Sequence, residues 1–224
     1  DFEHAAAIKV VRADVASPRL VERLRAERRT LARLKHPNIA QMYDGGETEE
    51  GAPYFIMEFV EGAPLDDYLA DHDVSLSDRL SLFQQACDGV AYAHRNLIIH
   101  RDLSPANMLV SEGGHVKLID FGISHSLDED SAAQNALPQM TMTKGYAAPE
   151  REQGVPASTM TDIYSLGVIL QEIIQNVDAP RKKDLAAIAA KARSRVAEER
   201  YQTVEAMARD LDAYRRKDAV AAVN

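Results

Sequence analysis

The alternation of apolar and polar positions predicts a first part of the chain that mixes strands with one helix. Residues 5–12 are apolar on both sides of Lys9, which predicts a strand. A helix is expected over residues 17–35, because a serine and a proline open it and leucines recur on one stripe. Strand-like segments follow at 39–43 and 54–60, and the turn-rich stretch between them predicts a hairpin.

Two charged residues of this first part lie in apolar surroundings. Glu27 falls on the leucine stripe of the expected helix, and Lys9 lies in the middle of the apolar strand. A carboxylate or an ammonium group on a core-facing surface is costly unless it is paired. Each of the two residues therefore needs a partner of opposite charge.

Helical periodicity dominates the rest of the chain after a break at residues 61–64. A short hairpin interrupts it, with strands at 108–110 and 116–119 on either side of a glycine pair. Residues 124–143 are polar and lack periodicity, and a structureless loop of about 20 residues in a compact domain is usually functional. Helices are expected over residues 77–95, 161–174, 183–193 and 203–216, the second of them apolar almost all round and hence buried.

These elements predict an α+β fold of two lobes. We expect a small β-rich N-lobe with one helix over residues 1–61, a larger and mainly helical C-lobe over 62–217, and a tail or linker over 218–224. A chain of 224 residues, of which 46% are hydrophobic, is long and apolar enough to build such a core.

Cysteine usage and the absence of long apolar runs favour a soluble domain. Cys87 is the only cysteine, so no disulfide can form within the chain, which favours a reducing compartment. The first residues lack the charged and apolar regions of a secretory signal, and no apolar run approaches the ~18 residues of a membrane helix. We therefore expect a cytoplasmic domain, alone or within a larger protein, that makes no membrane contact in this segment.

The formal net charge of −9 is unevenly distributed along the chain. Residues 9–35 are predominantly basic, whereas residues 44–73 contain many acidic residues and no lysine or arginine. Two solvated faces of opposite sign are the simpler interpretation, and an acidic stretch that attracts a basic substrate segment or partner is the alternative. The basic run is explained as one face of a helix, so we expect no nucleic-acid binding.

Two short motifs bring oxygen-bearing side chains close together in the sequence. Residues 100–107 read His-Arg-Asp-Leu-Ser-Pro-Ala-Asn and contain Asp102 and Asn107, and an Asp-Phe-Gly run begins at Asp120 after an apolar stretch. Hard Mg²⁺ takes oxygen ligands and leaves places for phosphates. This pair of motifs resembles the catalytic loop and the metal-binding loop of bacterial relatives of eukaryotic Ser/Thr protein kinases (Hanks-type kinases), and the resemblance covers almost the whole chain.

The resemblance implies ATP and Mg²⁺ as cofactors and suggests a role for each site residue. Lys9 would bind the nucleotide phosphates and pair with Glu27, which would satisfy both charges noted above. Asp102 matches the residue that accepts the proton of the substrate hydroxyl. Asn107 and Asp120 match the Mg²⁺ ligands that bridge the nucleotide phosphates.

The resemblance also implies an adenine site at the hinge between the lobes. Backbone groups of Glu58 and Val60 would hydrogen-bond the adenine, and Met57 would occupy the gatekeeper position behind it. His100 and Phe121 would be packing residues that hold the two loops in register.

Downstream residues match the family's activation segment, which begins at Asp120 and closes with Ala-Pro-Glu at Glu150. Glu150 and Arg200 match a buried ion pair that anchors this segment to the large lobe. Asp162 matches a residue that braces the catalytic-loop backbone, and Thr143 matches a threonine that supports the loop and separates Ser/Thr from Tyr kinases.

Regulation by phosphorylation of this segment is implied as well. Arg101 precedes the catalytic aspartate, and in the family such an arginine is often neutralised by an activation-loop phosphate. The oligomeric state stays open, a dimer for trans-autophosphorylation being one alternative. The candidate phosphoacceptors are Ser124, Ser126, Ser131, Thr141 and Thr143. Thr141 and Ser131 are better placed than Thr143.

Three features depart from the family pattern. The Gly-rich phosphate loop is absent from the sequence. Ser104 replaces the catalytic-loop lysine near the transferred phosphate, and one lost electrostatic donor of this sort costs about 10² to 10³ in rate. A short stretch at 175–184 joins the central helix to the next one, where the family normally has a further helix and a substrate-docking surface.

The leading interpretation is an ATP-dependent Ser/Thr protein kinase that transfers the γ-phosphate to protein hydroxyls, slowed by Ser104. A pseudokinase that binds nucleotide or acts as a scaffold is the alternative, favoured by Ser104 and the trimmed lobe. A small-molecule phosphotransferase shares the Asp, Asn and Asp pattern but lacks the long polar segment before Glu150. The residues whose presence argues against a pseudokinase are Lys9, Glu27, Asp102, Asn107 and Asp120.

Overall fold

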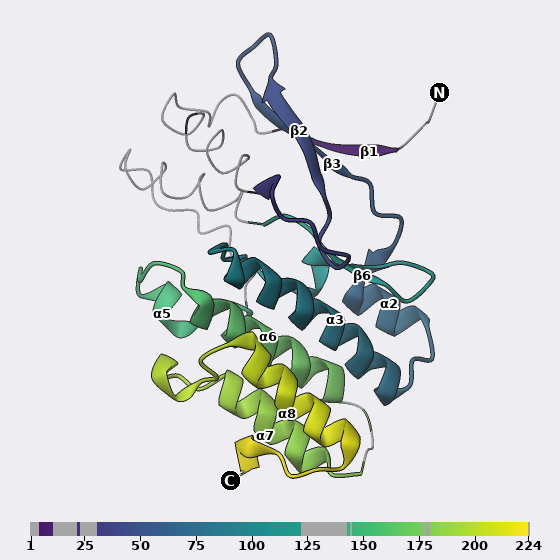
Figure 1. The fold of residues 1–224 in the computed structure, drawn as a ribbon, viewed down its shortest axis with the longest axis vertical. Helices are drawn as coiled ribbons and strands as arrows, with labels where there is room; N and C mark the ends of the chain where they lie inside the picture. Colours follow the sequence, from purple (N-terminus) through teal and green to yellow (C-terminus); the bar gives the residue numbers. More distant parts are fainter. Residues whose placement is uncertain are drawn as a thin grey trace.

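A computed structural model describes residues 5–10, 22, 31–121, 143, 145–175, 177 and 180–223. Figure 1 shows a β-sheet at one end of the molecule and a body of helices at the other, which confirms the predicted two-lobed α+β fold. The sheet is antiparallel in the order β1-β3-β2. Its strands are β1 (Ala6–Val10), β2 (Met42–Glu47) and β3 (Pro53–Glu58).

The predicted hairpin of the first lobe is present, but its first strand begins later than expected. Ile39 does not enter β2 and instead forms a parallel bridge with Leu118 of the second lobe. The N–H groups of Ala40 and Leu118 donate to the carbonyl oxygens of Leu118 and Asn38, at 2.9 Å each. Residues predicted as a strand thus join the lobes, because a tertiary contact overrides the local apolar pattern.

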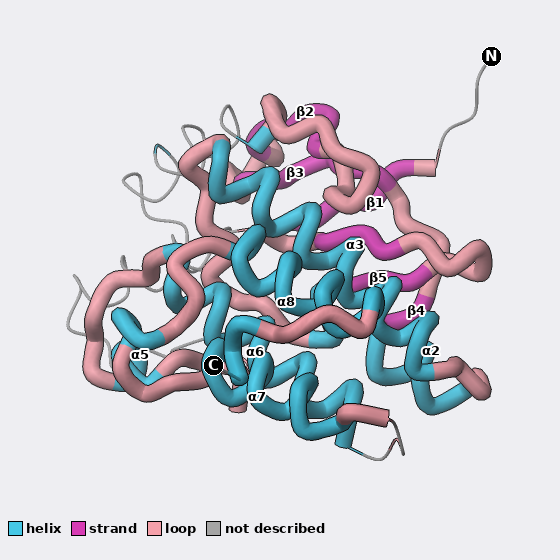
Figure 2. The backbone as a smooth tube through the Cα atoms, turned by 60° about the horizontal axis from the view of Figure 1, so that its bottom comes forward, coloured by secondary structure: helices cyan, strands magenta, loops and turns pink. Residues whose placement is uncertain are grey.

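A second antiparallel sheet lies between the first sheet and the helices, in the order β4-β5-β6. It contains the predicted hairpin of the second lobe, and Figure 2 shows β4 and β5 next to helix α2. Its strands are β4 (Ala63–Pro64), β5 (Met108–Val110) and β6 (Val116–Leu118). The position of the lobe boundary at residues 61–62 stays a prediction.

The helices of the second lobe lie close to their predicted positions. The four that were predicted are α3 (Leu76–Arg95), α6 (Thr159–Gln175), α7 (Lys182–Ala192) and α8 (Val204–Arg216). Two short helices that periodicity could not reveal are α2 (Leu65–Asp71) and α5 (Pro149–Glu152). Single 3-10 turns lie at Pro105–Asn107, Ala197–Glu199 and Ala221–Val223.

Helix α3 carries the chain toward the catalytic loop. Its N-cap is Ser75, whose Oγ accepts from the Asp78 N–H at 3.2 Å and donates to the Asp78 carboxylate at 2.7 Å. The Ser75 hydroxyl thus satisfies one of the backbone N–H groups that a helix start leaves open. The inner face of α3 buries Phe83 and Val90 completely.

Helix α6 is the centre of the second lobe, as its apolar sequence predicted. Its leucine and isoleucine side chains are buried, and it packs closely on α7. Gly167 permits this approach, because a Cβ there would lie 2.7 Å from the Cβ of Ala192.

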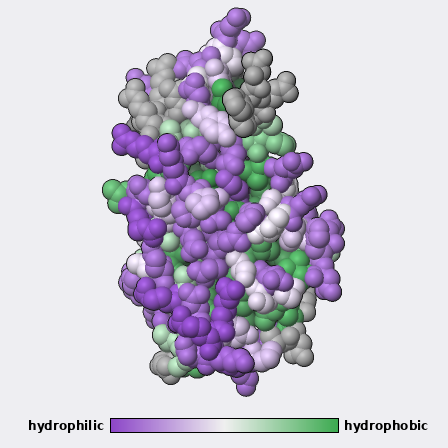
Figure 3. All heavy atoms as spheres, turned by 45° about the vertical axis from the view of Figure 1, so that its right-hand side comes forward, coloured by the Kyte–Doolittle hydropathy of each residue, from purple (hydrophilic) through white to green (hydrophobic). Residues whose placement is uncertain are grey.

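In Figure 3, hydrophilic residues cover most of the face shown, with apolar patches between them.

Several predicted features lie outside the described residues. Glu22 and Leu31 are helical, but Glu27 and most of the helix expected over 17–35 are not described. The polar segment 124–142 is not described either. Among the helices that are described, none combines the length and the apolar character needed to span a membrane.

Candidate active site

The backbone of the catalytic loop is held by Asp162, at the start of α6. This carboxylate is 1% exposed and accepts from the N–H groups of His100 at 2.8 Å and Arg101 at 2.9 Å. His94 Nε2 lies 2.8 Å from the same carboxylate. Arg101 has a φ of 75°, a left-handed conformation that a non-glycine residue keeps when its surroundings fix it. The bracing role expected of Asp162 is therefore confirmed.

His100 links the catalytic loop to the segment that leads into the Asp-Phe-Gly motif. Its imidazole is completely buried, and its Nε2 donates to the Ile119 carbonyl oxygen over 3.0 Å. Burial lowers the pKa of His100, which favours the neutral ring. The ring of Phe121 packs on it with centroids 4.4 Å apart. The two loops are thus held in register by His100 and Phe121, as expected.

Asp102 is oriented by Thr143 and Asn107. One carboxylate oxygen, Oδ1, accepts from both the N–H and the hydroxyl of Thr143, at 3.1 Å each. Asn107 Nδ2 donates to the Asp102 carbonyl oxygen at 2.8 Å and lies 3.5 Å from the other carboxylate oxygen, Oδ2. The contact from Thr143 brings the end of the activation segment to the catalytic loop. Two bonds on Oδ1 fix the carboxylate and leave Oδ2 with one long contact.

Asp120 and Lys9 meet across the two lobes. Lys9 Nζ lies 2.8 Å from Asp120 Oδ1, and their side chains are 37% and 28% exposed. Asp120 has a φ of 63°, and the N–H of Ile119 donates to the Asn107 carbonyl oxygen at 3.1 Å. The structure therefore brings Lys9, Asn107 and Asp120 to one place. The expected pairing of Lys9 with Glu27 stays a prediction, because Glu27 is not described.

Ser104 lies inside the catalytic loop but is shielded from solvent. Its relative exposure is 1%, and its Oγ has no hydrogen-bond partner in the described part of the chain. A buried hydroxyl without a partner costs about 1–3 kcal/mol of desolvation. The slow transfer expected from Ser104 in place of the lysine stays a prediction, and the sequence did not indicate that Ser104 is buried.

The hinge segment is fixed by the side chain of Glu58. Its carboxylate accepts from Lys117 Nζ at 2.8 Å and from the Gln41 N–H at 3.1 Å. The N–H of Glu58 donates to the Gln41 carbonyl oxygen, so the Glu58 group left for an adenine is its carbonyl. Met57 lines a cavity of about 30 Å³ behind the hinge, with Asp120 and other residues. Contacts of Met57, Glu58 and Val60 with a nucleotide stay predictions.

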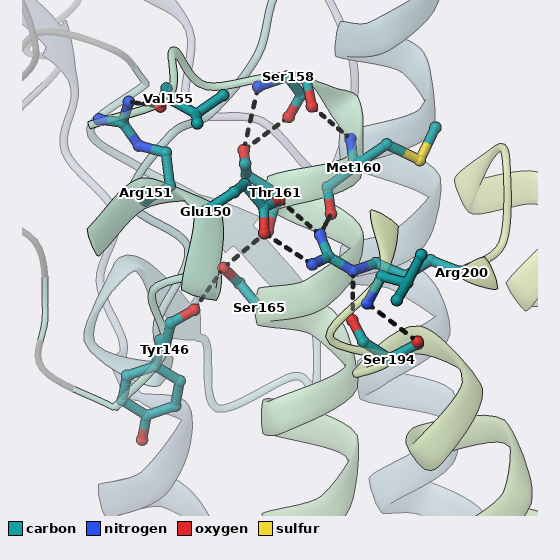
Figure 4. Close-up of polar contacts among 11 residues, drawn as sticks. Tyr146, Glu150, Arg151, Val155, Ser158, Met160, Thr161, Ser165, Ser194 and Arg200 are labelled. Atoms are coloured by element: carbon teal, nitrogen blue, oxygen red, sulfur yellow. Dashed lines mark hydrogen bonds and ion pairs between the residues drawn. The ribbon is translucent and has the colours of Figure 1, made fainter. Parts of the chain in front are cut away.

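The activation segment is anchored by Glu150 and Arg200, as Figure 4 shows. The Arg200 side chain is completely buried and donates two hydrogen bonds of 2.7 Å to the Glu150 carboxylate. It also donates to the carbonyl oxygens of Met160 at 2.9 Å and Ser194 at 2.8 Å. These hydrogen bonds from Arg200 hold the pKa of Glu150 below its ordinary value. The predicted ion pair is confirmed.

Two residues that support the site, Lys117 and His94, could not be identified as such from the sequence. Lys117 was read as one position of a strand, and His94 as the last turn of a helix. In the structure Lys117 holds the hinge through Glu58, and His94 contacts Asp162. Lys117 is a charged residue in an apolar strand, a signal that could have pointed to a buried partner. His94 carried no such signal.

Comparison with known proteins fits this geometry. A sequence model of the protein kinase domain family matches residues 2–214, so the chain belongs to the protein kinase family. It is 35% identical to serine/threonine-protein kinase PknB of Mycobacterium leprae over 237 residues, which cover 92% of this chain and 38% of that protein. It is 38% identical to serine/threonine-protein kinase PknA of Mycobacterium tuberculosis over 174 residues, which cover 75% of this chain and 40% of PknA. The chain thus spans about two fifths of the length of these relatives.

Proposed function

We propose that this chain is an ATP-dependent protein kinase domain that transfers the γ-phosphate of ATP to serine or threonine hydroxyls of protein substrates. One observation carries the proposal. Asp102 lies on a loop whose backbone is held by Asp162, and its carboxylate is oriented by Thr143. A hydrogen bond between Asn107 and Ile119 connects this loop to the segment that contains Asp120. The names and identities of the relatives support the same activity.

Asp102 would accept the proton of the substrate hydroxyl. Oδ1 is used by Thr143, whereas Oδ2 has one long contact of 3.5 Å with Asn107 and keeps lone pairs for a hydroxyl donor. A general base needs this hydrogen-bond reach to the proton that it removes. Thr143 would therefore act as a positioning residue that orients the catalytic carboxylate.

Asn107, Asp120 and Lys9 fit an ATP–Mg²⁺ group. The donor set is one carboxylate and one amide, few enough oxygens that phosphates and water would complete the coordination of Mg²⁺. Bound Mg²⁺ supplies neutralisation of the phosphate charge. Lys9 is held beside Asp120 by one described ion pair, in which both side chains are about a third exposed. It could exchange that carboxylate for a phosphate group.

The hinge would bind the adenine. The Glu58 side chain is fixed by Lys117 and Gln41, which sets the direction of its backbone carbonyl. Met57 would limit the depth of the adenine site from the side of the small cavity behind it. Backbone groups of Glu58 and Val60 would supply the hydrogen bonds.

The catalytic loop contributes no cation where the family has a lysine, because Ser104 stands there. Transfer would consequently be slow in comparison with a kinase that has this lysine. ATP as the phosphate donor and an unpaired, buried Cys87 favour the cytoplasm as the place of action.

Phosphate transfer from γ-labelled ATP tests the proposal. The full-length protein is incubated with Mg²⁺ and a generic Ser/Thr peptide, and phosphorylated residues are mapped by mass spectrometry. We expect Mg²⁺-dependent phosphoserine or phosphothreonine on the peptide and within residues 124–143. Nucleotide binding without any transfer would make the chain a pseudokinase. Transfer to a small alcohol such as choline but to no protein would make it a small-molecule phosphotransferase.

A further inference from the structure

Residues 218–223, which follow helix α8, turn back onto the helical lobe. Lys217 ends α8 with a φ of 65°, a left-handed conformation that turns the chain away from the helix axis. Figure 1 shows the C-terminal end of the chain beside α7, and the 3-10 turn Ala221–Val223 packs on that helix. We call residues 218–223 the C-terminal strap.

The C-terminal strap is held by an apolar contact and by hydrogen bonds of its backbone. Val220 is 2% exposed and belongs to the core of the helical lobe. The N–H of Asp218 donates to the Ala213 carbonyl oxygen at 2.8 Å. Arg181 Nη2 donates to the Asp218 carbonyl oxygen at 2.7 Å. A chain segment near a terminus stays ordered when it is tied down in this way, so the strap is a packed part of the fold.

Asp210 in α8 receives the far end of the strap. Its carboxylate is 6% exposed and accepts from the N–H groups of Ala221 at 2.9 Å and Ala222 at 3.0 Å. The same carboxylate accepts from the Tyr201 hydroxyl at 2.7 Å. Burial and this bond raise the pKa of Tyr201, so its hydroxyl keeps its proton and remains a donor. Asp210 therefore connects the strap to Tyr201.

Tyr201 is the neighbour in sequence of Arg200, which anchors the activation segment. Its ring is 4% exposed, and Lys191 Nζ lies 4.8 Å from the ring centroid. The completely buried Arg200 side chain starts from the same short stretch of backbone and donates two hydrogen bonds of 2.7 Å to Glu150. A shift of the Tyr201 ring would therefore move the backbone from which Arg200 reaches Glu150. Buried contacts run without a break from the strap to the end of the activation segment.

We propose that the C-terminal strap regulates the end of the activation segment. While the strap is docked on Asp210 it keeps Arg200 in place for Glu150, and its release loosens that anchor. Docked and released strap are two states of one short segment, which one buried valine and a few backbone hydrogen bonds hold together. The consequence for phosphate transfer rests on the proposed kinase activity, whereas the coupling of strap and anchor does not.

Hydrogen–deuterium exchange of the full-length protein, followed by mass spectrometry, tests the coupling. Val220→Ala removes two buried methyl groups, so the strap should be released more often and its two amides that bond to Asp210 should exchange about tenfold faster. The amides of Gln153 and Val155, which donate to the Glu150 carbonyl oxygen, should accelerate by the same factor. Faster exchange of the strap with unchanged exchange at Gln153 and Val155 would overturn the proposal.

Exchange in helix α3 is the internal control for the stability of the whole domain. Its amides should keep their rates in Val220→Ala, because release of the strap is a local opening. Equal acceleration of all protected amides, α3 included, would show a loss of global stability without specific coupling and would also overturn the proposal.

Two further variants separate docking from added charge. Val220→Asp puts a carboxylate into the buried position and should accelerate strap and anchor more than Val220→Ala does. Ala219→Asp adds the same charge at the exposed position next to it and should change neither. Equal effects of Val220→Asp and Ala219→Asp would overturn the proposal.

Phosphate transfer by the same preparations keeps the strap apart from the proposed function. Coupled exchange in a wild type that transfers no phosphate would contradict the kinase activity alone. Transfer by the wild type with uncoupled exchange in Val220→Ala would contradict the strap alone.

Discussion

The Glu150–Arg200 pair and the Lys9–Asp120 pair join the same kinds of charge in opposite settings. Arg200 is completely buried and has four hydrogen bonds to three acceptor residues, whereas Lys9 is about a third exposed and is held by one described ion pair. A buried guanidinium that makes four hydrogen bonds with its five N–H groups is a fixed part of the fold. An ammonium with one exchangeable partner is suited to bind a ligand. The contrast separates a structural ion pair from one that we propose belongs to the active site.

The largest expected effect is on stability and comes from Arg200→Ala. The change leaves the Glu150 carboxylate and two carbonyl oxygens without their partner in a buried site, and we expect a loss of about 3–5 kcal/mol in the free energy of unfolding. Urea denaturation followed by circular dichroism measures it. Arg216→Ala breaks an exposed pair with Asp218 and serves as the control, with an expected cost of about 0–1 kcal/mol. Similar losses of unfolding free energy in Arg200→Ala and Arg216→Ala would contradict the claim that the buried pair stabilises the fold more than an exposed pair does.

The second effect is on the chemistry and comes from Lys9→Met. Loss of one cation at the phosphates should lower the transfer rate by about 10² to 10³. The free energy of unfolding should fall by less than about 1 kcal/mol, because the pair with Asp120 is partly solvated. Rate and urea stability are measured on the same preparation. A large loss of stability with Lys9→Met would show that this pair, too, is structural.

The buried pair also predicts a pH dependence. The pKa of Glu150 is lowered by its bonds from Arg200, so the stability gained from the charged carboxylate is present above its ordinary pKa of 4.5 and is lost as the pH falls further. The difference in unfolding free energy between the wild type and Glu150→Gln should be constant from about pH 7 to 5 and shrink below about 4.5. Urea titrations at several pH values test this. A difference that stays constant down to pH 3 would contradict it.

The smallest effect is expected for Ser104→Ala. The hydroxyl is buried without a described partner, so its removal should raise the free energy of unfolding by about 1 kcal/mol or leave it unchanged. The transfer rate should stay the same if the hydroxyl does not reach the phosphate. Thermal unfolding and transfer assays of the two proteins decide. A clear fall in rate with intact stability would give the Ser104 hydroxyl a catalytic role.

Parts of the fold with a strong local pattern could be predicted from the sequence. Helix α6 is apolar almost all round, and the β5–β6 hairpin has a glycine turn between apolar strands, so the sequence predicts both at nearly their observed positions. Helix α2 could not be predicted from the sequence, because its seven residues are too few to show a helical period and no side chain caps it. Ile39 was misassigned because its bridge to Leu118 depends on how the lobes meet.

The candidate site shows the same division. The resemblance to the kinase family implied the pairing of Glu150 with Arg200, although fifty positions separate them in the sequence. The contacts of Lys117 with Glu58 and of His94 with Asp162 could not be predicted from the sequence, because tertiary packing decides which of many possible partners each residue meets. The burial of Ser104 likewise depends on atoms that are distant in the sequence.

The central claim is that Asp102 is the base of a phosphoryl transfer, and the Asp102→Asn variant tests it most directly. An asparagine can still accept the bonds from Thr143, so the loop should keep its geometry and the protein its thermal stability. Initial rates of transfer from ATP–Mg²⁺ to a Ser/Thr peptide are measured for the wild type and the variant side by side. We predict a fall of about 10² to 10⁴ for Asp102→Asn. Equal rates in the two proteins would contradict the account.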